Sequence, residues 1–530
     1  MARQTAAGLG PDHRGGGGRL GLSDRAGFMV LGNTAQSLAQ LATIMVLTRL
    51  FSRGEYGSYR QVWLVYFTLS PVLLLGVPYS IFYFMPRLDA EERRRFALRT
   101  VSLLFFLGAA LALVIGAGAP LIAASMKNPA LVPLLRAFAL YALFALPTAV
   151  LPNLLVADGR HRAAGAVIGG FAFTLAAVVV VAAAITHQVI WALRATALAA
   201  LVQWAVAAVL LTRAHGYRFS LDWGALKKQL GWSVPVGLSA VISVLAQRAG
   251  NWIVAVLYKS PATYGIYDVG AFEVPLVGVL TFSVTTTLLP IFSGMHHRDE
   301  IAALVRLWHE SMRKVALILF PVFVVLMVCA EPVMLILFTN KYAASVPIFR
   351  VYLLLLPLRT ANYSAVLQSV GETRALWRGT LGSLTAVAVV GTLLAHTIGM
   401  IGPAIGLVLA TYGVSVFWLL RTRRALGIRF AETFPWVRVG RIFGLSVVLG
   451  GVVLPILLLR LSPWATVAVI APLYGALYLI AISKMGLLTQ GDRDLARRWL
   501  TLSVLRRPAA EQAPGPAAPK GITPEVESQP

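Results

Sequence analysis

Charged residues are scarce in this sequence. Asp, Glu, Lys and Arg make up 13% of its 530 residues, whereas soluble globular chains contain about 25%. Hydrophobic residues make up 58%, and long apolar runs recur from residue 27 to residue 483. This composition excludes an ordinary soluble domain and predicts an all-α, polytopic membrane protein.

Cysteine is almost absent, since Cys329 is the only one. It lies in an apolar run, so the chain can form neither an internal disulfide nor a cysteine-based metal site. His187 and His396 are isolated, and we recognise no grouping of His, Asp and Glu with the spacing of a metal or catalytic site. We therefore expect no metal, no cofactor and no catalytic residues.

Acidic residues are few, because 21 Asp and Glu stand against 46 Lys and Arg, a net charge of +25. In a soluble protein this excess would suggest nucleic acid. Here the basic residues concentrate in alternate loops, as the positive-inside rule requires. The basic loops are 87–99, 160–162, 218–228, 298–313, 374–378 and 421–438. The intervening loops contain little beyond Arg53, Arg60, Lys127, Lys259, Lys341 and Arg460. The pattern predicts that both termini are cytosolic and that nucleic acid is not a partner.

Length and apolarity predict fourteen transmembrane helices. The predicted spans are 27–50, 61–86, 100–124, 130–156, 163–186 and 190–212 in the first half, 231–258, 266–293, 314–338, 345–369, 377–399 and 401–420 in the second half, then 441–460 and 462–483. They form two pseudo-symmetric six-helix lobes, 25–213 and 214–424, and two additional helices within 425–485. We expect 1–24 to be a disordered cytosolic tail, and 486–530 to be a basic amphipathic segment followed by a disordered tail.

An internal repeat supports the division into two lobes. Residues 27–59 and 234–267 each contain a span, a short polar loop and the pattern YGxY. In this register Gly57 corresponds to Gly265, and Gln40 corresponds to Arg248. Repeats of this kind are typical of transporters whose substrate site lies between two similar bundles.

Polar residues follow one face of a predicted span in each repeat. The first span carries Asn33, Gln36, Gln40 and Thr43, and the seventh carries Ser239, Ser243, Gln247 and Asn251. Such a stripe either bonds a neighbouring helix or lines water. Two stripes at matching positions favour a shared, hydrated cavity.

Three charged residues lie well inside predicted spans: Arg248, Arg359 and Glu273. A charge at mid-membrane costs about 2.5–3.5 kcal/mol on insertion scales, so it faces a cavity or a partner. Arg248 therefore either pairs with a carboxylate to hold the bundle together or binds an anionic cargo. Helical rise places Arg248 and Glu273 at similar depths. Glu273 then either neutralises Arg248, as a static pair or at rest, or carries a coupling proton.

Residues 296–314 carry Leu304, Leu307 and Trp308 among charges. This pattern predicts an amphipathic segment lying on the membrane surface. A similar pattern occurs at 492–507.

Several motifs resemble those of a known family. They are RLFSRGEYGSYRQVW at 49–63, GVPYSIFYFMPRL at 76–88, KKQLGWSVPVG at 227–237, QRAGNWIV at 247–254 and YGIYDV at 264–269. Together with the repeat, they look like the Wzx-type polysaccharide flippases of the MOP transporter superfamily, which also contains the MATE drug exporters and the lipid II flippases. The resemblance covers about residues 25–485.

The resemblance implies a two-lobed, V-shaped helical bundle in the bacterial cytoplasmic membrane. It implies a flippase that moves an undecaprenyl-pyrophosphate-linked oligosaccharide from the inner to the outer leaflet, with the membrane lipids around it and polysaccharide polymerase and glycosyltransferases as further candidate partners. In this family arginines lining a cationic central cavity are expected to matter, and Arg248 fits best. Arginine also suits a pyrophosphate chemically, because its fork matches phosphate oxygens.

The resulting candidate site combines both stripes and the buried charges. The predicted cavity residues are Arg248, Gln247, Asn251, Ser243, Gln40, Asn33, Gln36 and Arg359, with Glu273 as a coupling residue. A lipid II flippase remains open as an alternative. A MATE-like exporter would favour an acidic cavity and a carboxylate in the first span, which has none. A membrane glycosyltransferase would need acidic groups and a sizeable outer loop, and a purely structural scaffold leaves the stripes unexplained.

Overall fold

The computed structural model describes residues 22–215, 222–490 and 492. The predicted tails, 1–24 and 486–530, lie largely outside these ranges, as does the amphipathic segment predicted at 492–507. Phe28–Leu487 form one compact unit. Its described residues form helices joined by short connections and contain no strand, which confirms the all-α prediction.

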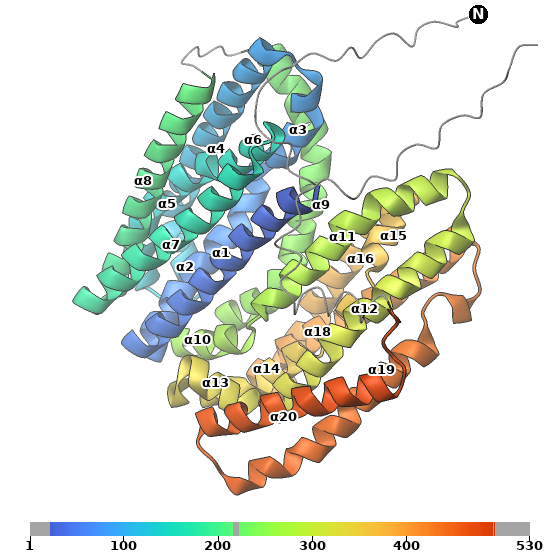
Figure 1. The fold of residues 1–530 in the computed structure, drawn as a ribbon. Coiled ribbons are helices and arrows are strands. Elements are labelled where there is room, and N and C mark those ends of the chain that lie inside the picture. The colour runs from blue at the N-terminus through green and yellow to red at the C-terminus, as the bar shows by residue number, and fades with distance from the viewer. Residues whose placement is uncertain (1–21, 216–221, 491, 493–530) are drawn as a thin grey trace, which may run out of the picture. The chain divides into compact units, whose positions relative to one another are not determined.

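The described residues of the first half form eight α-helices (Figure 1). They are α1 (Leu22–Leu50), α2 (Arg53–Leu74), α3 (Val77–Phe84), α4 (Ala90–Ser125), α5 (Leu131–Thr148), α6 (Leu151–Ala157), α7 (His161–Thr186) and α8 (Val189–His215). Helices α2 and α3 make up one span, interrupted where Leu75 and Gly76 both adopt positive φ.

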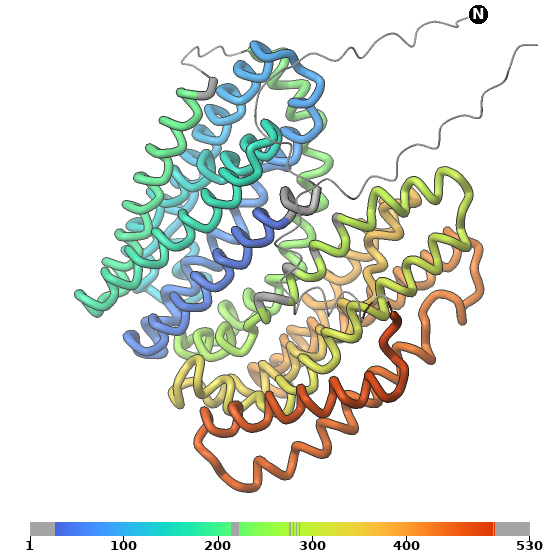
Figure 2. Tube along the Cα trace, viewed as in Figure 1, coloured from blue at the N-terminus to red at the C-terminus, as the bar shows by residue number. Residues whose placement is uncertain are grey.

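The second half is more often interrupted, as the trace in Figure 2 shows. Its helices are α9 (Trp223–Leu257), α10 (Pro261–Gly270), α11 (Pro275–His297), α12 (Ile301–Val328), α13 (Ala330–Phe338), α14 (Val346–Leu353), α15 (Tyr363–Ser369), α16 (Thr373–Ala386), α17 (Thr392–Ile398), α18 (Gly402–Leu426), α19 (Trp436–Val453) and α20 (Pro463–Lys484). Short 3₁₀ segments include Asn340–Ser345 and Pro357–Thr360.

Twelve segments of the described chain are long and apolar enough to cross a membrane. One of them, Thr373–Leu426, contains two predicted spans, because the chain turns at Gly399 with φ 76° and α18 then packs against α16 and α17. Helix α11 occupies most of the predicted eighth span. Each of the fourteen predicted spans therefore has a helical counterpart, and the polytopic architecture is confirmed.

The surface-lying segment predicted at 296–314 is wrong. These residues contain the start of α12, which continues without a break to Val328. Leu304 and Trp308 are fully buried in a core cluster with Tyr363 and Val366, and Trp308 Nε1 donates to the Ala361 carbonyl at 2.9 Å. An amphipathic helix can bury its apolar face against protein as well as against lipid, and the pattern does not distinguish the two.

Helices from both halves meet at the end of the bundle where α1 ends and α2 begins (Figure 1). There α10 packs against α2 through the repeat-related Gly57 and Gly265. A Cβ at Gly57 would overlap the Pro261 carbonyl oxygen, and one at Gly265 would lie 2.9 Å from the Arg53 carbonyl oxygen. Small residues allow this close approach of membrane helices.

We expect Gly57→Ala to destabilise the protein, because the new methyl group forces α2 and α10 apart. Overpacking of this kind costs about 1–3 kcal/mol. The measurement is the free energy of unfolding of the purified protein in mixed micelles. Gly54→Ala is the control, because a Cβ at Gly54 in the same helix meets nothing within 4 Å. Equal stability of the two variants would contradict the proposed packing.

Candidate functional site

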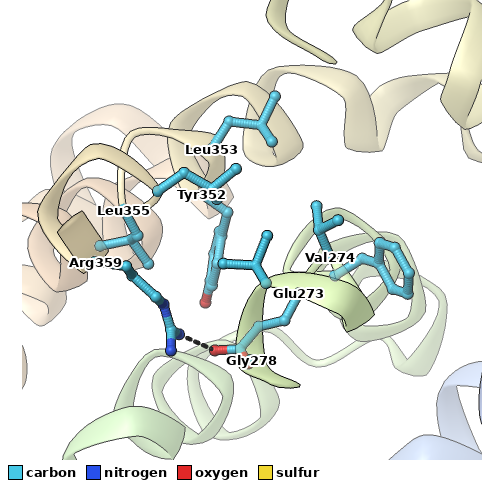
Figure 3. A pocket seen from close by; sticks show the side chains of 10 residues that line it. Glu273, Val274, Gly278, Tyr352, Leu353, Leu355 and Arg359 are labelled. Carbon is cyan, nitrogen blue, oxygen red and sulfur yellow. Dashed lines mark hydrogen bonds and ion pairs between the residues drawn. The ribbon is translucent and has the colours of Figure 1, made fainter. Parts of the chain in front are cut away.

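A pocket lies between two interrupted helices of the second half (Figure 3). One interruption separates α10, which ends at Gly270, from α11, and the other separates α14 from the 3₁₀ turn Pro357–Thr360. The lining residues are Phe272, Glu273, Val274, Val277, Gly278, Tyr352, Leu353, Leu355, Leu356 and Arg359. Irregular backbone at membrane depth is tolerated where protein covers it or where it lines a water-filled cavity.

Two predicted site residues meet in this pocket. Arg359 Nη2 lies 3.2 Å from Glu273 Oε1, and the side chains are 36% and 64% exposed. Figure 3 shows both side chains pointing toward one another, with the Tyr352 hydroxyl directed toward the same place. An exposed ion pair contributes little to stability. Its partners are therefore available to a charged ligand.

Glu273 pairs with Arg359 and not with Arg248, which resolves an alternative that the sequence left open. The Arg248 guanidinium carbon instead lies 5.2 Å from the centroid of the Phe67 ring of α2. Helical rise gives depth in the membrane but not the direction in which a side chain points. Equal depth was therefore insufficient to predict the pair.

Arg248 is half-buried and lies over the Phe67 ring. Phe67 stacks on Trp63 at 5.2 Å, and the Tyr264 and Tyr352 hydroxyls are near enough to interact electrostatically with the guanidinium. Within the part of the chain that the structure describes, no carboxylate forms an ion pair with Arg248. An aromatic ring attracts a cation but carries no net negative charge, so the guanidinium keeps its full positive charge.

The polar residues of each stripe differ in their exposure. On α9, Asn251 is 4% exposed and packs beside Tyr264, whereas Gln247 is exposed and its Nε2 lies 3.3 Å from Ser243 Oγ. On α1, Gln40 is exposed, and Asn33 and Gln36 are half-buried. None of these stripe residues lines the pocket of Arg359 and Glu273. A single hydrated cavity that joins both stripes stays a prediction.

The prediction that Arg60 lies in a loop is wrong. Arg60 belongs to α2, and its Nε and Nη2 donate to the two carboxylate oxygens of Asp268 at 2.6 and 3.1 Å. The side chains are 18% and 5% exposed. The repeat contained a signal for this pair, because Arg60 follows Tyr59 as Asp268 follows Tyr267.

Tyrosines fill the space between this ion pair and the pocket. The Tyr264 hydroxyl lies 3.4 Å from Asp268 Oδ1, and the Tyr267 and Tyr352 hydroxyls lie 3.1 Å apart. Tyr352 also lines the pocket with Glu273. Sequence reasoning missed all three tyrosines as site residues, although two of them belong to the repeated YGxY pattern.

The chemistry of these groups suits ion pairing. The pocket offers a guanidinium and a carboxylate, and Arg248 adds a second cation nearby. Among residues 22–215 and 222–490, no three His, Cys, Asp or Glu side chains group as a metal ion would require.

Comparisons with known proteins agree with the fold. Residues 46–347, more than half of the chain, match the family model described as "Polysaccharide biosynthesis protein". A lipid II flippase, MurJ, in an inward closed conformation is similar with TM-score 0.67 and 12% identity, covering 86% of this chain and 99% of that one. An inward-facing multidrug resistance MATE transporter of the MOP superfamily is similar with TM-score 0.60 and 18% identity, covering 74% and 94%. No curated protein matches. The chain therefore belongs to the polysaccharide biosynthesis protein family and has the fold of the MOP superfamily of transporters and flippases.

Proposed function

We propose that the protein is a flippase for undecaprenyl-pyrophosphate-linked oligosaccharide. It moves this lipid from the inner to the outer leaflet of the bacterial cytoplasmic membrane by alternating access, for surface polysaccharide biosynthesis. The observation that carries the proposal is the pair of arginines at mid-span, Arg248 without a carboxylate partner in the described chain and Arg359 with an exposed one. The family and the fold support a transporter or flippase.

In this proposal the two repeats are the moving bodies. Residues 25–213 and 214–424 form the lobes, the helices within 425–485 are additional, and both termini are cytosolic. The end where α1 meets α2 then faces the outside of the cell. The lipid tail stays in the bilayer during transport. Polar side chains such as Gln36, Gln40 and Gln247 provide a path for the sugars.

The arginines bind the pyrophosphate. This group carries about two negative charges and cannot cross hydrocarbon unaided. At about 4 Å and an effective dielectric constant near 20, one contact between a guanidinium and a phosphate oxygen is worth roughly 4 kcal/mol before desolvation. Arg248 gains most from such a contact, because among the described residues it meets one ring face and no carboxylate.

Glu273 competes with the substrate for Arg359. When the pyrophosphate approaches, it displaces the carboxylate, and Glu273 then turns toward water or accepts a proton. This exchange makes Glu273 the coupling residue of the cycle. The exposure of the pair supports the proposal, since a sealed ion pair could not be exchanged at low cost.

The charge of the site disfavours one of the two alternatives and is compatible with the other. A lipid II flippase carries the same pyrophosphate and shares this chemistry, so the glycan must be identified by experiment. A MATE-like exporter of cationic drugs would favour an acidic cavity, yet Gly27–Leu50 contain no carboxylate. Polysaccharide polymerase and glycosyltransferases are the partners that would consume and supply the transported lipid.

We expect Arg248→Ala to abolish export of the lipid-linked glycan while the protein still inserts normally. Loss of one charge-assisted contact of about 1.5–3 kcal/mol corresponds to roughly tenfold or more in binding. Arg248→Lys should keep part of the activity, because lysine retains the charge but not the fork. The measurement is surface glycan, with lipid-linked intermediates inside the cell, in a deletion strain complemented with each variant.

Arg350→Ala is the matched control, because Arg350 is an exposed arginine of α14 outside the pocket. It should complement fully. Full surface glycan with Arg248→Ala would overturn the role of that residue.

Glu273→Gln should leave folding intact and change transport. The carboxylate is 64% exposed, so its ion pair contributes less than about 1 kcal/mol to the free energy of unfolding. Without the negative charge, Arg359 stays free to hold the substrate, and export slows while binding of the lipid-linked glycan persists. The measurements are unfolding in mixed micelles and export in the complemented strain. A loss of more than about 2 kcal/mol in stability, well above the upper limit for an exposed pair, would show that the pair is structural.

A further inference from the structure

The repeat-related residues of α2 and α10 face each other directly. Gly57 contacts Gly265, and one helical turn further along the same faces Arg60 bonds Asp268. We name these four residues the clasp. Residues related by a repeat would repel at such a contact if both were charged alike. Here one repeat supplies the cation and the other the anion, so the contact is attractive.

The clasp contains an ion pair that is largely shielded from solvent. Arg60 is 18% exposed and Asp268 5%, and both carboxylate oxygens accept hydrogen bonds from the guanidinium. The Arg298–Glu300 pair has the same two-bond geometry at 2.8 and 3.1 Å, but its side chains are 59% and 43% exposed. It also links residues two positions apart, whereas the clasp links the two halves of the chain. Separating the clasp would leave two charges without partners unless water reaches them.

Further bonds fasten the halves at the same end. Arg49 of α1 donates to the carbonyl oxygens of Ile336 and Leu337 at 2.7 and 2.9 Å, where α13 ends. Lys341 donates to the Arg49 carbonyl oxygen at 3.1 Å. The Tyr56 ring lies edge-on to the Tyr342 ring at 5.8 Å. Tyr342 is 1% exposed.

We propose that the clasp is the latch that holds the outer end of the transporter closed, and that it opens once in each transport cycle. The inference rests on the proposed alternating-access function. A lipid-linked cargo can leave toward the outside only after α2 and α10 separate, because their backbones touch at Gly57 and Gly265. The buried ion pair makes the contact bistable: it is strong while dry, and it loses most of its strength once water enters.

The test measures how fast a cysteine beside the latch reacts with a membrane-impermeant maleimide added to whole cells. Cys329→Ala removes the native thiol, and Tyr342→Cys places a new one at the buried contact with Tyr56. With Arg60 and Asp268 intact the reaction should be slow. Asp268→Asn should raise its rate by about tenfold or more, since the population of the open state increases.

Exchanging the two charges of the clasp distinguishes a latch from a purely structural role. Arg60→Asp combined with Asp268→Arg should return the rate toward that of the intact pair. Glu300→Gln, which breaks an exposed pair of the same geometry, should leave the rate unchanged. Should Asp268→Asn fail to reach the membrane, Arg60→Gln provides the same comparison.

An unchanged rate in Asp268→Asn and Arg60→Gln, or labelling of the introduced thiol only from the cytosolic side, overturns the latch. The readout does not depend on the identity of the glycan. If labelling responds as expected but the deletion strain accumulates no lipid-linked glycan, the latch stands and the proposed substrate is wrong.

Discussion

Helices α2 and α10 join the two repeats at one end of the bundle. Two glycines bring the helices close enough for Arg60 to reach Asp268, and the ion pair then fixes the register of the two repeats. Neither the glycines nor the ion pair would define this contact alone. Without the glycines the charges would stand apart in a medium that does not solvate them, and without the charges a glycine contact would specify little beyond closeness.

Three arginines in this protein carry the same charge in three different environments. Arg60 is largely shielded and bonds both oxygens of Asp268, Arg359 is paired but more exposed, and Arg248 lies over the Phe67 ring without a carboxylate partner in the described chain. The positive charge is therefore neutralised most by neighbouring groups at Arg60, less at Arg359 and least at Arg248. The least compensated cation is the one for which an anionic ligand relieves the largest cost, which is why the binding role is assigned to Arg248 and the closing role to Arg60.

Hydropathy and the repeat predicted much of the fold, because both depend on the order of residues along the chain. The helical spans and the equivalence of Gly57 and Gly265 follow from that order. Direction around a helix axis does not follow from it. The pairing of Glu273 with Arg359, the burial of Trp308 and the pairing of Arg60 with Asp268 depend on which neighbour a face meets, and periodicity supplies no such information.

The fold is shared by a lipid II flippase and a multidrug transporter, so it cannot by itself select the cargo. We propose that the few charged side chains at mid-span select the cargo. A cationic cargo would find two guanidinium groups and a carboxylate already engaged by one of them. An anionic headgroup would find one guanidinium that no carboxylate of the described chain pairs with, and a second that an exposed carboxylate holds. The same physics that makes an uncompensated arginine costly in a membrane makes the second arrangement the one that gains free energy from its ligand.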